Sequence, residues 1–172
     1  MVGWRYGWLL LLLTGCSANP TPPTDPQRLA TIQAELGGRY LAQGEYALAQ
    51  LKLQKAIAQA PHHPLAHHYL GELYRRLQRP ALAADHYRQA LDGAPNDNAL
   101  RNNYGVFLCE QQRYSEAEEQ FLRVLQDPLY PLPQRVYENL AVCANRAGDT
   151  TAAERWYRQA EQIRLNRQSI TP

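Results

Sequence analysis

The sequence predicts an all-α fold, a right-handed superhelix (α-solenoid) of about four helix-turn-helix units. The first observation behind this prediction is a residue pair ending in a small residue, which recurs at intervals of 34, 34 and 36 residues. The pairs are Leu36-Gly37, Leu70-Gly71, Tyr104-Gly105 and Leu140-Ala141. The second observation is a helix break a few residues after each pair. The breaks are Gly44, Gln78-Arg79-Pro80, Gln112-Arg113 and Gly148-Asp149.

The third observation is the pattern of the helix that follows each break. Twelve residues after the small residue of each pair stands an alanine: Ala49, Ala83, Ala117 and Ala153. Four residues later comes a large apolar residue: Leu53, Tyr87, Phe121 and Tyr157. This spacing resembles the tetratricopeptide repeat, a helix-turn-helix of 34 residues. Its small residues let two helices approach closely, and its larger residues fill the space on either side.

The repeat region is expected to cover residues 28–166, with repeats at about 30–63, 64–97, 98–133 and 134–167. The expected helix pairs are 29–42 with 46–59, 64–77 with 80–93, 98–111 with 114–126, and 133–146 with 150–165. Because one unit cannot bury its apolar face alone, stacking supplies the core, and the first helices line the concave face. The last helix carries Trp156, Ile163 and Leu165, which either the polar tail at 167–172 or a partner would cover.

Residues 1–15 indicate a bacterial lipoprotein signal peptide. Arg5 supplies the positive charge, Trp8 to Leu13 form an apolar run, and Leu13-Thr14-Gly15-Cys16 matches a lipobox. The apolar run is shorter than the roughly 20 residues that span a bilayer. Cys16 is therefore predicted to carry a diacylglyceryl group and a further acyl chain, which together anchor a protein stably. The alternative is an ordinary signal peptide that ends in a chance cysteine.

A proline-rich linker is expected at residues 16–27, since the stretch SANPTPPTDPQ after Cys16 contains four prolines and no apolar residue except alanine. An extended tether of this length reaches roughly 34 Å from a membrane. The simpler interpretation is a spacer with no other role. In lipoproteins of this class an Asp after the acylated cysteine signals retention in the inner membrane, so Ser17 implies sorting to the outer membrane.

The charge balance and the missing motifs exclude several functions. Without residues 1–15 the chain carries 17 Lys+Arg against 16 Asp+Glu, which leaves no electrostatic footprint for nucleic acid or acidic head groups. The sequence has no nucleophile–histidine arrangement, no glycine-rich phosphate loop and no HExxH motif. We therefore expect no enzyme, no cofactor and no small-molecule substrate.

The densest group of potential metal ligands is His62, His63, His67 and His68. A metal site needs convergent ligands and usually includes a carboxylate or a thiolate. His67 occupies a position where the repeat carries a core aromatic residue, and His62 and His63 flank a helix start. The pattern therefore favours loop and core histidines over a metal site.

Cys109 and Cys143 fall on the first helices of neighbouring units. In an oxidising compartment they can form a disulfide, provided that their Cα atoms lie about 4.4–6.8 Å apart. The register favours this bond. The alternative is a pair of free buried thiols that behave as small apolar residues.

The repeat register also predicts a partner-binding groove on the concave face, of mixed polar and apolar character. Such a surface suits an extended segment or a helix of a partner protein; the alternative is a groove filled only by solvent. Its predicted residues are His68, Glu72, Arg75, Arg76, Asn102, Val106, Glu110, Glu138, Val142 and Asn145.

Three stretches in the third and fourth units resemble the type IV pilus biogenesis and stability lipoproteins of the PilF/PilW family. They are NNYGVFLC at 102–109, DPLYP at 127–131, and YENLAVCA at 137–144, with AGD following at 147–149. The resemblance extends from Arg28 to the end of the repeats and includes the lipobox. Both cysteines fall inside the matching stretches, which strengthens the disulfide hypothesis. Members of the family typically have six repeats, whereas this chain has four.

The resemblance implies a pilotin, a lipoprotein anchored on the periplasmic face of the outer membrane of a Gram-negative bacterium. Such a protein binds secretin subunits of a type IV pilus machine and promotes their localisation and multimerisation. The alternative is a general periplasmic repeat scaffold or protease-adaptor lipoprotein with a different protein client.

Overall fold

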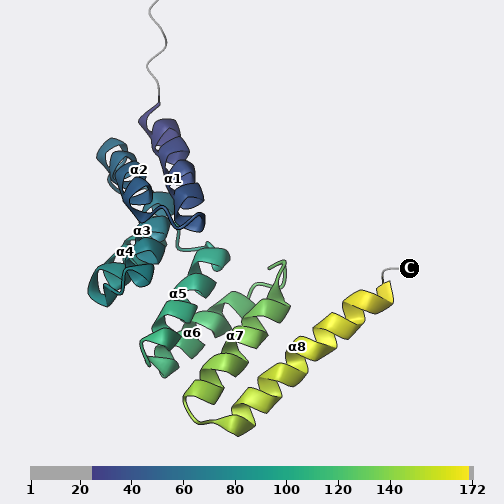
Figure 1. Cartoon of the computed structure of the whole chain (residues 1–172). Helices are drawn as coiled ribbons and strands as arrows, with labels where there is room; N and C mark the ends of the chain where they lie inside the picture. The colour runs from purple at the N-terminus through teal and green to yellow at the C-terminus, as the bar shows by residue number, and fades with distance from the viewer. Residues whose placement is uncertain (1–24, 171–172) are drawn as a thin grey trace, which may run out of the picture.

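The computed structural model describes residues 25–170, which form eight α-helices joined by short turns (Figure 1). The helices form four antiparallel pairs that stack one after another along the chain, so the predicted all-α superhelix is confirmed. Their bounds are α1 Pro26–Ala42, α2 Tyr46–Gln59, α3 Pro64–Arg76, α4 Pro80–Gly93, α5 Asn98–Glu110, α6 Tyr114–Leu125, α7 Pro133–Arg146 and α8 Thr150–Ile170.

Local signals place the helix starts close to their predicted positions. A proline at the first turn suits a helix start, because it lacks the N–H that would otherwise stay unpaired there. Aspartates cap two of the starts, those of α1 and α5: the Oδ1 atoms of Asp25 and Asp97 each accept a backbone N–H at 2.9 Å. The helices that begin with proline are α1, α3, α4 and α7.

The turn inside every pair contains one residue in the left-handed backbone region. These residues are Gly44, Gln78, Gln112 and Gly148, with φ of 81°, 54°, 61° and 86°. In the second pair the N–H of Arg79 then donates to the carbonyl of Tyr74 at 2.8 Å, and the other pairs repeat this closing bond. The left-handed region favours glycine. The two glutamines therefore occupy a conformation that costs free energy.

The two helices of a pair approach closely where the small residue of each recurring motif stands. A Cβ atom on Gly105 would lie 2.6 Å from Cε1 of Phe121, whose ring is completely buried. The fourth pair differs, since Ala141 has a Cβ and Tyr157 is 46% exposed instead of filling the space. Ala141 thus carries a methyl group where the other three pairs have a glycine, and α8 has no later helix of residues 25–170 beside it.

The buried apolar side chains form two clusters. One combines α1, α2 and α3, and includes Leu53, Leu70 and Leu73. The other combines α4 to α7, and includes Tyr87 and Phe121. The partly buried side chain of Tyr74 packs against both clusters. The change from one cluster to the other thus occurs within the second repeat.

The structure differs from the sequence prediction at both ends of the repeat region. Residues 26 and 27, predicted to end the linker, form the first turn of α1. The tail predicted at 167–172 continues α8 to Ile170, so its described part does not fold back over the last helix. Trp156 of that helix stacks on Tyr137 of α7, while Leu165 is 50% exposed.

The predicted signal peptide, Cys16 and most of the linker lie outside the described residues. Between residues 25 and 170, no helix has the length and apolar character needed to cross a membrane.

Candidate functional site

The first helices α1, α3 and α5 surround a cleft of about 320 Å³. Five of the ten residues predicted for the partner-binding groove line it: His68, Glu72, Arg75, Arg76 and Val106. The other lining residues are Gly38, Leu41, Ala42, Tyr69 and Asn103. The cleft therefore lies at the meeting of the first three repeats.

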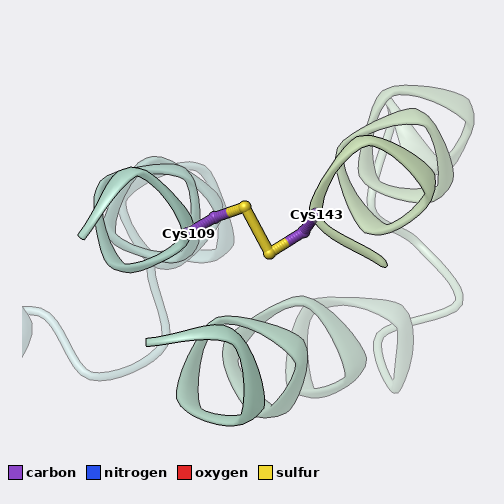
Figure 2. The surroundings of a disulfide bond; sticks show 2 residues. All are labelled: Cys109 and Cys143. Atoms are coloured by element: carbon purple, nitrogen blue, oxygen red, sulfur yellow. A yellow bond between two sulfur atoms is a disulfide. The ribbon is translucent and has the colours of Figure 1, made fainter. Parts of the chain in front are cut away.

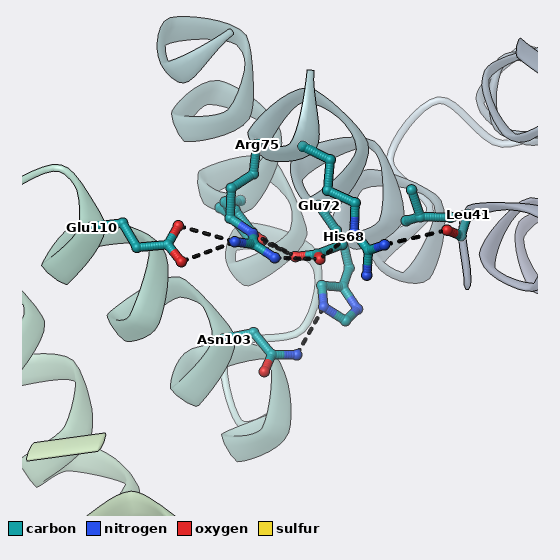
Figure 3. A network of polar contacts seen from close by, with 8 residues as sticks. Leu41, His68, Glu72, Arg75, Asn103 and Glu110 are labelled. Carbon is teal, nitrogen blue, oxygen red and sulfur yellow. Dashed lines mark hydrogen bonds and ion pairs between the residues drawn. The ribbon is translucent and has the colours of Figure 1, made fainter. Parts of the chain in front are cut away.

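Glu72 is the centre of a polar network on one side of the cleft (Figure 3). Its carboxylate accepts two hydrogen bonds from Arg75, at 2.6 and 2.9 Å, and one from Arg76 at 3.1 Å. The hydroxyl of Tyr87 donates a fourth at 3.0 Å. Burial alone would raise the pKa of the Glu72 carboxyl, but these hydrogen bonds hold it below its usual value. Glu72 is thus an ionised carboxylate with its acceptor sites filled.

Arg75 connects this network to the next repeat. Its Nη1 atom donates to both carboxylate oxygens of Glu110 on α5, at 2.9 and 3.0 Å. The hydrogen bonds to Glu72 are the main reason why the pKa of Arg75 is raised further above its ordinary value. Arg75, Glu72 and Glu110 were predicted as groups that contact a partner. The structure shows them engaged with one another, with Arg76 balancing the remaining charge.

A second polar link crosses the cleft between His68 and Asn103. The Asn103 amide donates to Nε2 of His68 across 3.0 Å (Figure 3). Burial lowers the pKa of His68, against the opposing effect of Glu72 and Asp97. A neutral imidazole is the form that can accept this hydrogen bond.

The sequence prediction chose Asn102, but the structure places its neighbour Asn103 in the cleft. Asn102 is only 4% exposed, and its Oδ1 atom accepts a hydrogen bond from Asn139 of α7 at 3.0 Å. Asn102 therefore connects helices within the stack. The repeat spacing alone does not choose between the two, because Asn102 follows His68 by 34 residues, Asn103 follows Tyr69 by 34 residues, and both His68 and Tyr69 line the cleft.

The three predicted groove residues of α7 lie away from this cleft. Val142 is 41% exposed, and Asn145 is also exposed. Glu138 accepts a hydrogen bond from Gln134 at 2.8 Å and lines a separate cleft of about 190 Å³. The ten predicted residues thus fall into an α3–α5 group and an α7 group.

Cys109 of α5 and Cys143 of α7 face each other across the junction of the third and fourth repeats (Figure 2). Their Cα atoms lie 5.7 Å apart, within the range that a disulfide requires, and the structure joins their Sγ atoms. Both residues are buried, at 5% and 3% exposure. Oxidation of this pair in the protein stays a prediction, which reduction experiments can test.

The four neighbouring histidines have separate structural positions. The ring of His63 caps α3 by accepting the N–H of Ala66 at 3.3 Å, and it contacts Thr31 of α1 at 2.9 Å. His67 contacts the carbonyl of Pro61 at 2.7 Å, while His62 is exposed and His68 lines the cleft. No three potential metal ligands among residues 25–170 converge on one point.

Comparison with known proteins places these features in a family context. The profile described as "Tetratricopeptide repeat" matches residues 35–98 and 99–168. The type IV pilus assembly protein PilF of Pseudomonas aeruginosa strain PAO1 is 34% identical over 165 residues, which cover 92% of this chain. The chain spans 65% of the length of that relative.

Two solved structures share both fold and sequence with this chain. The structure of P. aeruginosa PilF matches with a TM-score of 0.75 at 34% identity, covering 83% of this chain and 63% of that one. The structure of PilW, described as a widely conserved type IV pilus biogenesis factor, matches with a TM-score of 0.75 at 28% identity. That match covers 80% of this chain and 63% of PilW.

Proposed function

We propose that this chain, which belongs to the tetratricopeptide repeat family and is homologous to PilF and PilW, binds a protein partner in type IV pilus biogenesis. The observation that carries the proposal is the identity to a pilus assembly protein, which extends over 92% of the chain. The specific partner that we propose is the secretin subunit of a type IV pilus machine. Binding would promote its localisation and multimerisation in the outer membrane.

The proposed mechanism divides the work between two parts of the chain. The repeats hold the secretin subunit by non-covalent contacts, since stacked repeats present an extended surface for a partner. Acyl chains on Cys16 anchor the complex to the periplasmic face of the outer membrane, because two or more chains give stable membrane binding. No covalent bond of the partner is made or broken in this mechanism.

The geometry indicates which substitutions test the binding surface. Arg75 and Glu72 are poor choices, because they bond to one another, so replacing either one changes the polar network as well as the surface offered to a partner. Val142→Asp places a charge on an exposed groove position, whereas Leu122→Asp does the same on α6, outside the predicted groove. The two side chains are similarly exposed, at 41% and 39%, so Leu122→Asp is a matched control.

The experiment uses a deletion strain complemented with wild type, Val142→Asp, Leu122→Asp or Cys16→Ala. We expect secretin multimers in the outer membrane with wild type and Leu122→Asp, and fewer with Val142→Asp. With Cys16→Ala both the chain and the secretin should be mislocalised. If secretin multimers form in the outer membrane without the protein, the secretin proposal fails. The alternative, a periplasmic scaffold or protease adaptor with another client, would then take its place.

A further inference from the structure

The junction between the second and third repeats is built differently from the other two junctions. In the first junction α1 and α3 pack closely and share one apolar cluster. In the third junction α5 and α7 share the other cluster and hold the cysteine pair. At the second junction α3 and α5 stay further apart, and their buried apolar residues belong to different clusters.

Two polar links connect α3 and α5 on the cleft side of this junction. They are the Arg75–Glu110 ion pair and the His68–Asn103 hydrogen bond, which we call the latch (Figure 3). The side chains of Arg75 and Glu110 are 27% and 30% exposed, so water and salt screen their attraction. An ion pair of this kind adds little stability.

An aromatic contact joins the two repeats at more deeply buried positions of the junction, next to the latch. The ring of Tyr87 on α4 lies 5.7 Å from that of Tyr104 and 5.2 Å from that of Phe107, both on α5. These three residues, which we call the pivot, are at most 7% exposed. Separating them would expose large apolar surfaces to water, which is unfavourable. A motion at this junction therefore breaks the latch before the pivot.

The latch and the pivot are connected through Glu72. The Tyr87 hydroxyl donates to one Glu72 oxygen, and the same carboxylate holds Arg75 in the position from which it reaches Glu110. The exposed ion pair of the latch is thus aligned by Glu72, which is itself hydrogen-bonded to the buried pivot residue Tyr87.

We propose that the second repeat junction is a hinge, which turns about the pivot and is held closed by the latch. The cleft lined by α1, α3 and α5 widens when the latch opens. The surface offered to a partner therefore has more than one width, and a bound segment that replaces the latch contacts selects the open form. This hinge follows from the fold, and it does not depend on the identity of the partner.

Distance measurements by pulsed electron spin resonance test the hinge in the full chain in detergent micelles. Spin labels on p-acetylphenylalanine leave the native cysteines untouched. One label pair, at Gln54 of α2 and Glu118 of α6, spans the junction, and a second, at Gln54 and Gln89 of α4, lies within the first two repeats. All three label positions are exposed. The latch variant is Glu110→Ala/Asn103→Ala, and the control is Glu116→Ala, which breaks the Arg113–Glu116 pair inside one repeat.

We expect the latch variant to broaden and shift the distances between Gln54 and Glu118, while the distances between Gln54 and Gln89 stay unchanged. Glu116→Ala should leave both distributions as in wild type. In 1 M NaCl the Gln54–Glu118 distance distribution of wild type should broaden and shift as it does in the latch variant, because salt screens the Arg75–Glu110 pair. The hinge is refuted if the distribution across the junction is the same in all proteins and salt conditions. It is also refuted if the latch variant loses its helical circular dichroism, since the latch would then hold the fold.

Discussion

The hydroxyl of Tyr87 donates a hydrogen bond to Glu72 across 3.0 Å, at the end of a ring that is completely buried. The ring fills the space against Gly71, while the hydroxyl helps to neutralise a carboxylate at the edge of the cleft. One side chain thus serves the apolar core and the polar network together. Burial first, and then the neighbouring Glu72 charge, raise the pKa of Tyr87 above its ordinary value, so the hydroxyl stays a donor.

Tyr87→Phe should destabilise the protein while leaving the packing of the ring intact. A hydrogen bond to a charged group contributes about 1.5–3 kcal/mol, so we expect a loss of that order in the free energy of unfolding. Urea denaturation followed by circular dichroism measures it. Tyr157→Phe is the control, since that ring is 46% exposed and should change stability far less. Equal losses in the two variants would show that the Glu72 contact contributes nothing.

Gln78→Gly should stabilise the protein. Gln78 has φ of 54°, a region that costs a residue with a side chain roughly 1–2 kcal/mol. Glycine removes that cost but gains entropy in the unfolded chain, so we expect a net gain of about 0.5–1 kcal/mol. The reciprocal change, Gly44→Ala, should destabilise, because Gly44 has φ of 81° in the equivalent turn. Thermal melts of both variants measure these changes in stability. A melting temperature of Gln78→Gly below that of wild type would contradict the prediction.

Reduction should destabilise the third and fourth repeats. If Cys109 and Cys143 are bonded, a reductant removes roughly 2–4 kcal/mol from the free energy of unfolding. Urea curves with and without tris(2-carboxyethyl)phosphine measure this loss. The Cys109→Ser/Cys143→Ser variant is the control, and its curve should not respond to the reductant. Two free thiols found by mass spectrometry of protein isolated under non-reducing conditions would refute the disulfide.

Acidification should lower stability through the histidine cap of α3. Burial and the neighbouring His67 lower the pKa of His63 in the folded protein below the unfolded value of about 6.5. The unfolded chain therefore binds more protons below that pH, so stability is complete above pH ~6.5 and falls as the pH falls. Protonation also removes the ring nitrogen that accepts the N–H of Ala66.

The measurement is the melting temperature at pH 7 and pH 5.5, for wild type and for His63→Asn. Asparagine is a good helix cap and does not titrate. The melting temperature of the variant should therefore fall less between pH 7 and pH 5.5 than that of wild type. Burial also lowers the pKa values of His68 and His86. Because both proteins contain these residues, part of the dependence of stability on pH should remain in both. The same drop in both proteins would exclude His63 as a source of the pH dependence.

The helical repeat could be predicted from sequence, but part of the candidate site could not. The period of small residues follows from steric packing, which repeats in every unit, so Gly71 and Gly105 mark the helix pairs directly. Asn102 and Asn103 are adjacent on one helix, and the rotation of each repeat against the next decides which of them faces the cleft. Arg75 and Glu110 stand 35 residues apart, and their pairing depends on side-chain conformations that the repeat pattern does not specify.

The end of α8 was missed for another reason. Residues 167–170 lack the apolar spacing that indicates a packed helix, so the sequence pattern predicts a tail there. No glycine or proline interrupts the chain there before Pro172, and the helix continues to Ile170 beyond the part that packs on α7.

The spacing of the two cysteines has a consequence for a chain under tension. With the bond closed, residues 109 and 143 stay together when the protein is pulled between its tether and the end of α8. Their separation of 34 residues corresponds to a contour length of about 110 Å that the chain cannot release. A force transmitted through a bound partner could therefore extend the first two repeats and α8, but not the chain between residues 109 and 143, which contains α6.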